Sequence, residues 1–152
     1  MPFMIFSIHQ QMSELHSHTK LNYKDYNWKG KTFLVADDDL YSCMLLSKIL
    51  DKTGANVYCA SDGREALELI KKHPEINIAL LDIIMPAYSG YEIVHEAQKI
   101  RPDILYIACT ADVFRVDPDF CRDLGFSAWI TKPFLPVKLF RTICEAMELN
   151  ES

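Results

Sequence analysis

Four short apolar runs, each followed at once by an acidic, hydroxyl or lysine side chain, constrain this sequence most. A short apolar run bounded by turn residues is typical of a strand buried on both faces of a parallel sheet. The residues that follow the runs are Asp37, Asp38 and Asp39, then Asp82, Thr110 and Lys132. If the strands are parallel, their carboxyl ends meet at one edge, where crowded carboxylates need a cation. The sequence therefore predicts a Mg²⁺-dependent phosphoryl site.

The size and charge of the chain narrow its class. Its 152 residues fit one domain plus a short extension, and a hydrophobic share of 49% is enough for a core. The net charge is −5, and no run of Lys and Arg stands out. A nucleic-acid surface would leave a basic footprint, so we expect no nucleic-acid partner.

The cysteines and the N-terminus indicate a reducing compartment, with the cytoplasm as the default. The five cysteines are odd in number and widely spaced, and most lie in apolar periodic segments. We therefore expect mostly small buried thiols and no zinc site. The apolar start over residues 1–6 is too short for a signal peptide or a membrane-spanning helix, so no membrane association is expected.

Residues 1–30 differ in composition from the rest of the chain. They are polar without a sustained period, and we expect an N-terminal extension or linker that is partly disordered, with aromatic residues able to pack onto the domain. Its histidines, His9, His16 and His18, are expected to be solvated rather than bound to metal. One domain is expected over residues 31–149, with no output domain after it.

From residue 31 onward, strand and helix patterns alternate. The expected strands are about 32–36, 56–60, 77–81, 104–109 and 127–131. The expected helices are about 40–52, from 61–62 to before Pro74, 91–100, from 117–118 to Gly125, and from Pro136 onward. The inward face of the third helix is expected to hold Ile93, Val94, Ala97 and Ile100.

Five such β-α units predict an α/β fold with a doubly wound parallel sheet covered on both faces. The flavodoxin-like (βα)5 arrangement, with strand order 2-1-3-4-5, is the common solution at this size. In that order the first and third strands flank the topological switch point, where ligands bind beyond the strand ends. Asp37 and Asp82 fall at this point, so the position of the chemistry agrees with the topology.

The run of three aspartates exceeds what a turn requires. Asp39 alone can cap the following helix. Asp37 and Asp38 point in different directions from adjacent positions, so one can reach a cation directly and the other through water. Asp82 is then the candidate nucleophile, because a carboxylate can form an acyl phosphate.

Two cationic or hydroxyl side chains complete the predicted site. Lys132 follows the fifth strand, and its long stem can reach Asp82 as a point charge. Thr110, at the end of the fourth strand, can give a hydroxyl to a phosphoryl oxygen. Trp129 lies within the fifth strand and is, on composition alone, more often a core residue than a switch.

Taken in order, these motifs resemble the receiver domain of bacterial two-component response regulators. The resemblance covers about residues 31–148, and although each motif is weak alone, the whole set is specific. The matching segments are Asp37-Asp38, Leu81-Asp82-Ile83-Ile84-Met85-Pro86 with Gly90, Thr110-Ala111 and Lys132-Pro133-Phe134.

The resemblance implies roles for individual residues. Asp82 would accept phosphate from a histidine kinase or a histidine phosphotransfer protein. Mg²⁺ would be bound by Asp37, Asp38, Asp82 and the backbone carbonyl of Ile84. Lys132 and Thr110 would contact the phosphoryl group, Trp129 would be the switch aromatic, and the bond from Lys132 to Pro133 would be cis.

Some positions depart from the family pattern or tune it. The family loop often has Asp before the glycine, where this chain has Ser89, and Trp129 is larger than the usual Tyr or Phe. In the family, the positions of Ile84 and Asp112 tune the lifetime of the phosphate. A homodimer through the fourth helix, fifth strand and fifth helix is a further family habit.

Several functions fit this sequence. A stand-alone receiver would act by docking or by relaying phosphate, with only self-phosphorylation and self-dephosphorylation chemistry. A receiver segment of a hybrid histidine kinase is the second, with residues 1–30 as linker. A Mg²⁺-dependent phosphohydrolase with an Asp nucleophile is the third, although Ile84 stands where such an enzyme usually has a second acid. A pseudo-receiver used as a scaffold is the fourth, and the full acidic and lysine set argues against it.

Overall fold

The computed structural model describes residues 22–85, 88–111 and 117–151. Its five strands form one parallel sheet in the order β2-β1-β3-β4-β5. The strands are β1 (Thr32–Ala36), β2 (Asn56–Ala60), β3 (Ile78–Asp82), β4 (Leu105–Thr110) and β5 (Ala128–Thr131). The doubly wound topology predicted from the sequence is confirmed.

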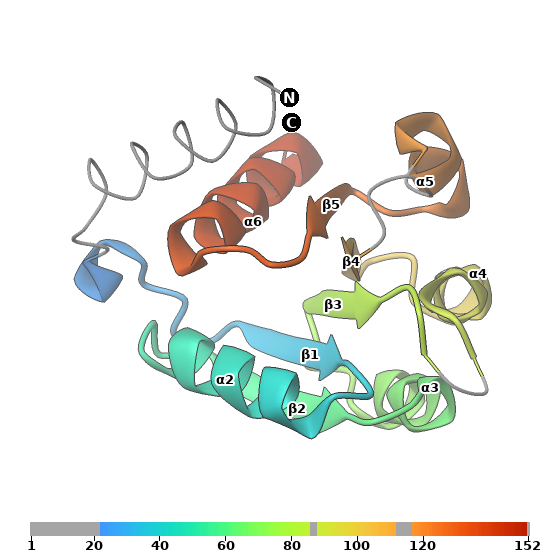
Figure 1. Ribbon diagram of the computed structural model, residues 1–152, viewed down its shortest axis with the longest axis horizontal. Coiled ribbons are helices and arrows are strands. Elements are labelled where there is room, and N and C mark those ends of the chain that lie inside the picture. The colour runs from blue at the N-terminus through green and yellow to red at the C-terminus, as the bar shows by residue number, and fades with distance from the viewer. Residues whose placement is uncertain (1–21, 86–87, 112–116, 152) are drawn as a thin grey trace, which may run out of the picture.

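Helices cover both faces of the sheet (Figure 1). They are α2 (Leu40–Asp51), α3 (Gly63–Lys72), α4 (Gly90–Ile100), α5 (Pro118–Leu124) and α6 (Pro136–Glu151), preceded by the 3₁₀ turn η1 (Tyr23–Asp25). Residues of α2 and α6 pack on one face, and residues of α3, α4 and α5 pack on the other. Because all strands are parallel, their carboxyl ends lie along one edge of the sheet.

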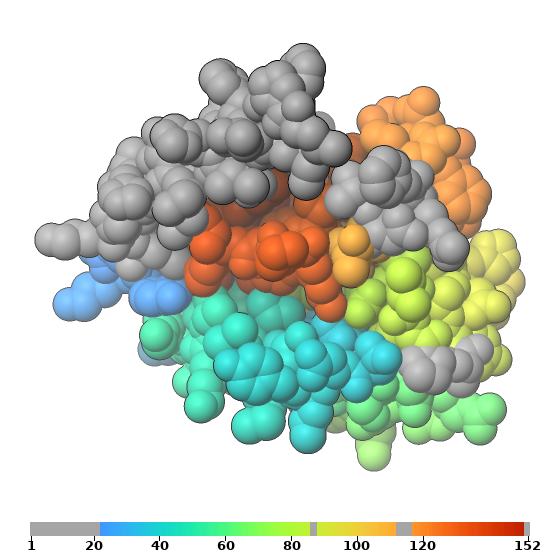
Figure 2. All heavy atoms as spheres, in the orientation of Figure 1, coloured from blue at the N-terminus to red at the C-terminus, as the bar shows by residue number. Residues whose placement is uncertain are grey.

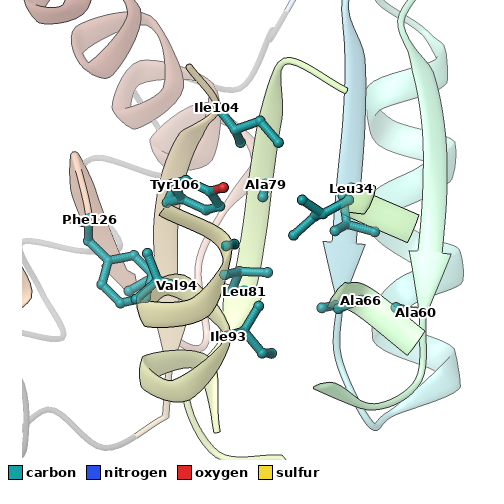
Figure 3. Close-up of a cluster of buried hydrophobic side chains, with 14 of the residues drawn as sticks. Leu34, Ala60, Ala66, Ala79, Leu81, Ile93, Val94, Ile104, Tyr106 and Phe126 are labelled. Atoms are coloured by element: carbon teal, nitrogen blue, oxygen red, sulfur yellow. The ribbon is translucent and has the colours of Figure 1, made fainter. Parts of the chain in front are cut away.

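Burial follows the position of each strand in the sheet. Every residue of β1, β3 and β4 is buried, whereas the outer strands β2 and β5 are partly exposed. The three central strands are covered on both sides, which explains why their sequences are apolar runs rather than alternating patterns. Figure 3 shows the core on the α3–α4 side, where Leu81 and Tyr106 project from the sheet toward Ile93 and Val94 of α4.

Capping residues start α2, α3 and α5 where the sequence predicts, and α4 one residue before the predicted start. Asp39, Asp62 and Asp117 each accept a backbone N–H of the first turn of the helix they precede. Ser89 forms a capping box with Glu92 at the start of α4. Such side chains satisfy amide groups that lack a partner within the helix.

One apolar residue and the five cysteines can be compared with the sequence prediction by their burial. Ile100 does not face inward as expected but is 47% exposed, and it is the last residue of α4. Three of the five cysteines, Cys43, Cys109 and Cys121, are buried, as expected for most of them, whereas Cys59 is exposed.

The packed structure begins before β1. Trp28 is 6% exposed, and its ring centroid lies 5.0 Å from that of Phe140 on α6. Tyr26 packs on the same ring at 4.8 Å, and the Trp28 backbone N–H donates to Thr53. These contacts tie the lead-in to the face formed by α2 and α6. None of the helices within the described ranges is long and apolar enough to cross a membrane.

Candidate functional site

Three strands bring the predicted charged residues to one edge of the sheet. Asp37 follows β1, Asp82 ends β3, and Lys132 follows β5. Ala36 pairs with Leu81 in the sheet, so Asp37 and Asp82 are neighbours at the ends of adjacent strands. Because side chains alternate between the faces of a strand, these residues continue the face covered by α2 and α6.

Lys132 joins the two aspartates. Its Nζ lies 2.5 Å from Oδ2 of Asp37 and 3.1 Å from Oδ2 of Asp82. One carboxylate oxygen each from Asp37, Asp38 and Asp82 lie within 4.8 Å of one another, and we call these three residues the acidic cluster. Asp37 and Asp82 are buried, whereas Asp38 is exposed. The cluster therefore opens to solvent on the side of Asp38.

Local backbone groups fix the second oxygen of each buried carboxylate. The amide of Asp39 donates to Oδ1 of Asp37 at 2.9 Å, and the amide of Ile84 donates to Oδ1 of Asp82 at 3.0 Å. Each donor lies two residues after its acceptor, which is the geometry of an Asx turn. Both carboxylates are thus held by the turn that follows their strand, with their other oxygen on Lys132.

Burial and charge act in opposite directions at this site. Burial raises the pKa of Asp82 above its usual value, and hydrogen bonds from Lys132 and the Ile84 amide only partly oppose it. For Lys132, burial favours the neutral amine, but hydrogen bonds to Asp37 and Asp82 outweigh it and raise the pKa of Lys132. The ammonium is therefore held in its charged form by the two carboxylates.

The donor set of the acidic cluster suits a hard divalent cation. Three carboxylates face one ammonium, so negative charge remains after Lys132 is counted. Mg²⁺ prefers one or two carboxylates and completes its shell with water and phosphate oxygens. The exposed Asp38 leaves the approach for such ligands open. No cysteine or histidine belongs to this group, so its chemistry is that of an oxygen-only site.

Thr110 and Trp129 lie on the other side of the sheet. Thr110 is buried and pairs in register with Thr131, and its carbonyl accepts the backbone N–H of Lys132 at 2.7 Å. Trp129 pairs with Ala108, so it shares the α4–α5 face with Thr110, and it is 37% exposed. Thr110 and Trp129 are therefore linked to Lys132 by the backbone of β4 and β5, although their side chains lie on the opposite face of the sheet from Asp37 and Asp82. The bond from Lys132 to Pro133 is cis, as expected.

The loop after Asp82 approaches the site closely at Gly90. A Cβ atom placed on Gly90 would lie 2.6 Å from the carbonyl oxygen of Asp82, which backbone atoms cannot accommodate. Gly90 also donates its amide to Ile83 at 3.0 Å. Gly90, which matches the family pattern, thus allows α4 to begin directly against the end of β3. Asp112 lies outside the described residues, and the side chain of Ile84 is 53% exposed.

Comparison with known proteins identifies the family. The family model described as "Response regulator receiver domain" matches residues 33–144. The chain belongs to this family. Receiver domains are the phosphoacceptors of two-component signalling, they interact with histidine kinases or phosphotransfer proteins, and they bind Mg²⁺ at an acidic pocket.

Solved receiver structures share this fold. A CheY-like receiver domain protein from Methanospirillum hungatei is 31% identical, with a TM-score of 0.74 over 80% of this chain and 96% of that one. CheY in a complex with CheX, BeF3 and Mg from Borrelia burgdorferi is 26% identical, with a TM-score of 0.73 over 77% of this chain and 89% of that one.

Plant histidine kinases are similar to this receiver in sequence. "Histidine kinase 3" of Arabidopsis thaliana is 27% identical, and "Probable histidine kinase 4" of Oryza sativa subsp. japonica is 26% identical, each over 136 residues. Each match covers 75% of this chain but only 13% and 14% of those proteins, respectively. The receiver thus corresponds to a small part of each kinase.

Sequence reasoning placed Asp37, Asp38, Asp82 and Lys132 at one edge, and the structure brings them together there. It linked Lys132 to Asp82 but missed the shorter contact with Asp37. The strand order places β3 and β4 between β1 and β5, so this contact depends on the Lys132 side chain reaching along the sheet edge, which no local sequence pattern indicates. The lysine side chain is long enough for the Lys132 ammonium to contact both carboxylates.

Proposed function

We propose that Asp82 of this receiver accepts a phosphoryl group from a phosphohistidine and that the acidic cluster holds the Mg²⁺ needed for the transfer. Asp37, Asp38, Asp82 and the backbone carbonyl of Ile84 would supply the protein ligands. The observation that carries the proposal is the convergence of Lys132 on Asp37 and Asp82, with Asp38 within ligand distance. In this arrangement the Lys132 ammonium and a bound cation would both lie beside the Asp82 carboxylate and offset the charge of an incoming phosphoryl group.

In this proposal, Oδ2 of Asp82 forms a bond to phosphorus as the P–N bond to the donor histidine breaks. The imidazole leaves with the electron pair of that bond. Oδ1 stays on the Ile84 amide, 3.0 Å away, so the turn holds the nucleophile in place. Mg²⁺, when bound, neutralises charge on the phosphoryl oxygens, which is most of what such transfers require.

Lys132 and Thr110 have separate roles in the proposal. The Lys132 ammonium lies 3.1 Å from the attacking carboxylate, so it can pair with a phosphoryl oxygen once Asp82 is modified. Thr110 would bring its hydroxyl to a second phosphoryl oxygen. Because Trp129 shares its face of the sheet, movement of Thr110 would change the space available to the partly exposed Trp129 ring.

The surface of α2 supports a protein as the phosphate donor. Within the described residues, four of the ten most exposed large apolar side chains lie in the first half of this helix: Leu40, Tyr41, Met44 and Leu45, between 47% and 73% exposed. In Figure 2 the teal atoms of α2 form part of the surface, beside the orange segment that follows β5. α2 begins directly after the acidic cluster, so a helical partner seated there could present a histidine to Asp82.

The stand-alone and hybrid-kinase origins remain two forms of this proposal. The similarity to plant histidine kinases favours a receiver of the hybrid type. In either form we propose that the domain is not a turnover enzyme and that it works in the cytoplasm, a compartment in which thiols are ordinarily kept reduced. Output would pass through altered protein contacts.

A homodimer through α5, β5 and α6 is a proposal for that output. It is supported by exposed aromatic side chains on these elements, since Phe120 is 48% exposed and Trp129 is 37% exposed. Sedimentation of the phosphorylated and unmodified protein tests it. We expect a larger species only in the phosphorylated sample. Equal sedimentation coefficients for the two samples would contradict the proposed dimer.

A small phosphoramidate and a simple phosphoester separate this function from a phosphohydrolase. Phosphoramidate contains the P–N bond of phosphohistidine, and with Mg²⁺ it should yield one phosphoryl group on the protein by intact mass. An aryl phosphoester should show no turnover above buffer. Steady hydrolysis of the phosphoester without a phosphorylated protein would instead favour the hydrolase.

A further inference from the structure

Two thiols lie together beside the acidic cluster. Cys43 of α2 and Cys59 of β2 are neighbours: Sγ of Cys59 lies 3.7 Å from the backbone carbonyl of Cys43, and Sγ of Cys43 lies 3.7 Å from the carbonyl of Ala60, the residue after Cys59. Ser47 holds Cys59 on that side, since its Oγ lies 3.0 Å from Sγ of Cys59 and 2.8 Å from the Cys43 carbonyl. Each thiol therefore lies against the backbone at or beside the other cysteine, although the two belong to different elements.

The two thiols have different environments. Cys59 is exposed on the outer strand, where a small oxidant in solution can reach it. Cys43 is buried, and its Sγ lies 3.5 Å from the carbonyl of Val35 and 3.8 Å from that of Asp37. Cys59 is therefore the thiol that meets an oxidant first, and Cys43 is the partner behind it.

We propose that Cys43 and Cys59 are a redox-sensitive thiol pair that closes to a disulfide when a hydroperoxide oxidises Cys59. Sulfur of Cys59 takes one oxygen of the peroxide as the O–O bond breaks, giving a sulfenic acid and water. Sulfur of Cys43 then bonds to sulfur of Cys59, the S–O bond breaks, and a second water leaves with the thiol proton. Two thiols are oxidised and one hydrogen peroxide is reduced to two waters.

The disulfide would act on the acidic cluster through the main chain. Forming it removes the S–H of Cys43, which contacts the backbone carbonyl of Asp37 at 3.8 Å. It also ties α2 to β2 one helical turn after Asp39, the N-cap residue that follows the acidic cluster. Contacts around a metal ligand tune its affinity for the metal, and this contact is to the backbone of Asp37 rather than to its carboxylate. This second step depends on the proposed function, because it takes Asp37 as a Mg²⁺ ligand.

Peptide mapping tests the disulfide directly. Trypsin places each of the five cysteines in a peptide of its own, Cys43 in 32–48 and Cys59 in 53–64. Hydrogen peroxide should link these two peptides and remove two of the five thiols, and dithiothreitol should reverse both changes. A link between two copies of 53–64, or loss of thiols without this link, would overturn the proposal.

Variants separate the chemistry from general oxidation. Cys59→Ser should keep all its remaining thiols in peroxide, whereas Cys144→Ser, which removes a half-buried thiol on α6, should still form the link. Cys43→Ser keeps a hydrogen-bond donor in the core and should leave Cys59 as a sulfenic acid that dimedone traps. Failure of dimedone to label Cys59 in that variant would contradict the assigned order of oxidation.

Mg²⁺ titration tests the link to the acidic cluster. The reduced protein reports whether the cluster binds Mg²⁺ at all, which is the proposed function. The ratio of the Mg²⁺ dissociation constants of oxidised and reduced protein reports the inference, and we expect weaker binding after oxidation. Normal binding by reduced protein with an unchanged affinity after oxidation would remove the link while leaving the proposed function standing.

Discussion

Nζ of Lys132 lies 3.1 Å from Oδ2 of Asp82, although fifty positions separate the two residues in the chain. The same ammonium lies 2.5 Å from Oδ2 of Asp37. Parallel topology produces this contact, because it returns the ends of β1, β3 and β5 to one edge of the sheet. A single cation therefore compensates two buried carboxylates when no metal is bound.

Replacing Lys132 by Met should destabilise the domain by about 2–4 kcal/mol at neutral pH, because it leaves two buried carboxylates facing each other without a partner. Millimolar Mg²⁺ should recover part of the loss by taking over the charge compensation. Urea unfolding with and without Mg²⁺ measures both effects. Lys138→Met, at an exposed position of α6, is the matched control and should change little. Equal stability of the Lys132 variant and the wild type would contradict the assigned pairing.

Asp37→Asn should weaken Mg²⁺ binding by about tenfold or more, since loss of a direct ligand costs at least as much as loss of a supporting contact. Asp39→Asn provides the comparison, because asparagine can still cap α2 and Asp39 is occupied with Tyr41 and Ser42. Isothermal titration or tryptophan fluorescence gives both affinities. An equal loss in both variants would indicate a general effect of acidic charge rather than a site at Asp37.

The sequence predicts the sheet well because its central strands are buried on both faces. Their apolar runs end in punctuating residues, and β1 and β2 have the predicted bounds. The predicted bounds of the other strands differ by a residue at one or both ends, because pairing with a neighbour decides where a strand stops. Gly125, with φ of 106°, ends α5 where a left-handed residue is needed.

Contacts between distant segments escape such reasoning. The position of Lys132 beside Asp37, the packing of Trp28 on Phe140, and the proximity of Cys43 to Cys59 depend on how helices and loops cross the sheet. Ile100 shows the same limit at smaller scale, because the period places it inward, whereas it is exposed as the last residue of α4. The local sequence pattern therefore predicts the helices and strands, whereas these contacts depend on how the helices and loops pack across the sheet.

Trp28→Ala should destabilise the domain by about 3–5 kcal/mol, the usual cost of removing a buried aromatic side chain. The lost contacts are those with Phe33 and Phe140, at centroid separations of 5.5 Å and 5.0 Å. Trp28→Phe should recover much of the stability, and chemical denaturation measures both. A negligible change in Trp28→Ala would mean that the lead-in does not contribute to the folded domain.

Tyr41→Glu should slow transfer from a phosphorylated histidine-containing protein by about tenfold, which corresponds to about 1.4 kcal/mol of binding energy. Phosphorylation by a small phosphoramidate should stay unchanged, because the small donor does not need the surface of α2. Ile100→Glu, at an exposed apolar position of α4, is the control and should affect neither donor. Equal slowing with both donors would place the effect in the site rather than at the docking surface.

Mapping the phosphorylated residue shows whether Asp82 accepts the phosphoryl group with the help of Mg²⁺. The protein is incubated with phosphoramidate and Mg²⁺, digested and sequenced by mass spectrometry, in parallel with Asp82→Asn and with a sample containing EDTA. We expect one phosphoryl group on Asp82 in the wild type and none in either parallel sample. Phosphate on another residue, or on Asp82 at the same rate in EDTA, would contradict this expectation.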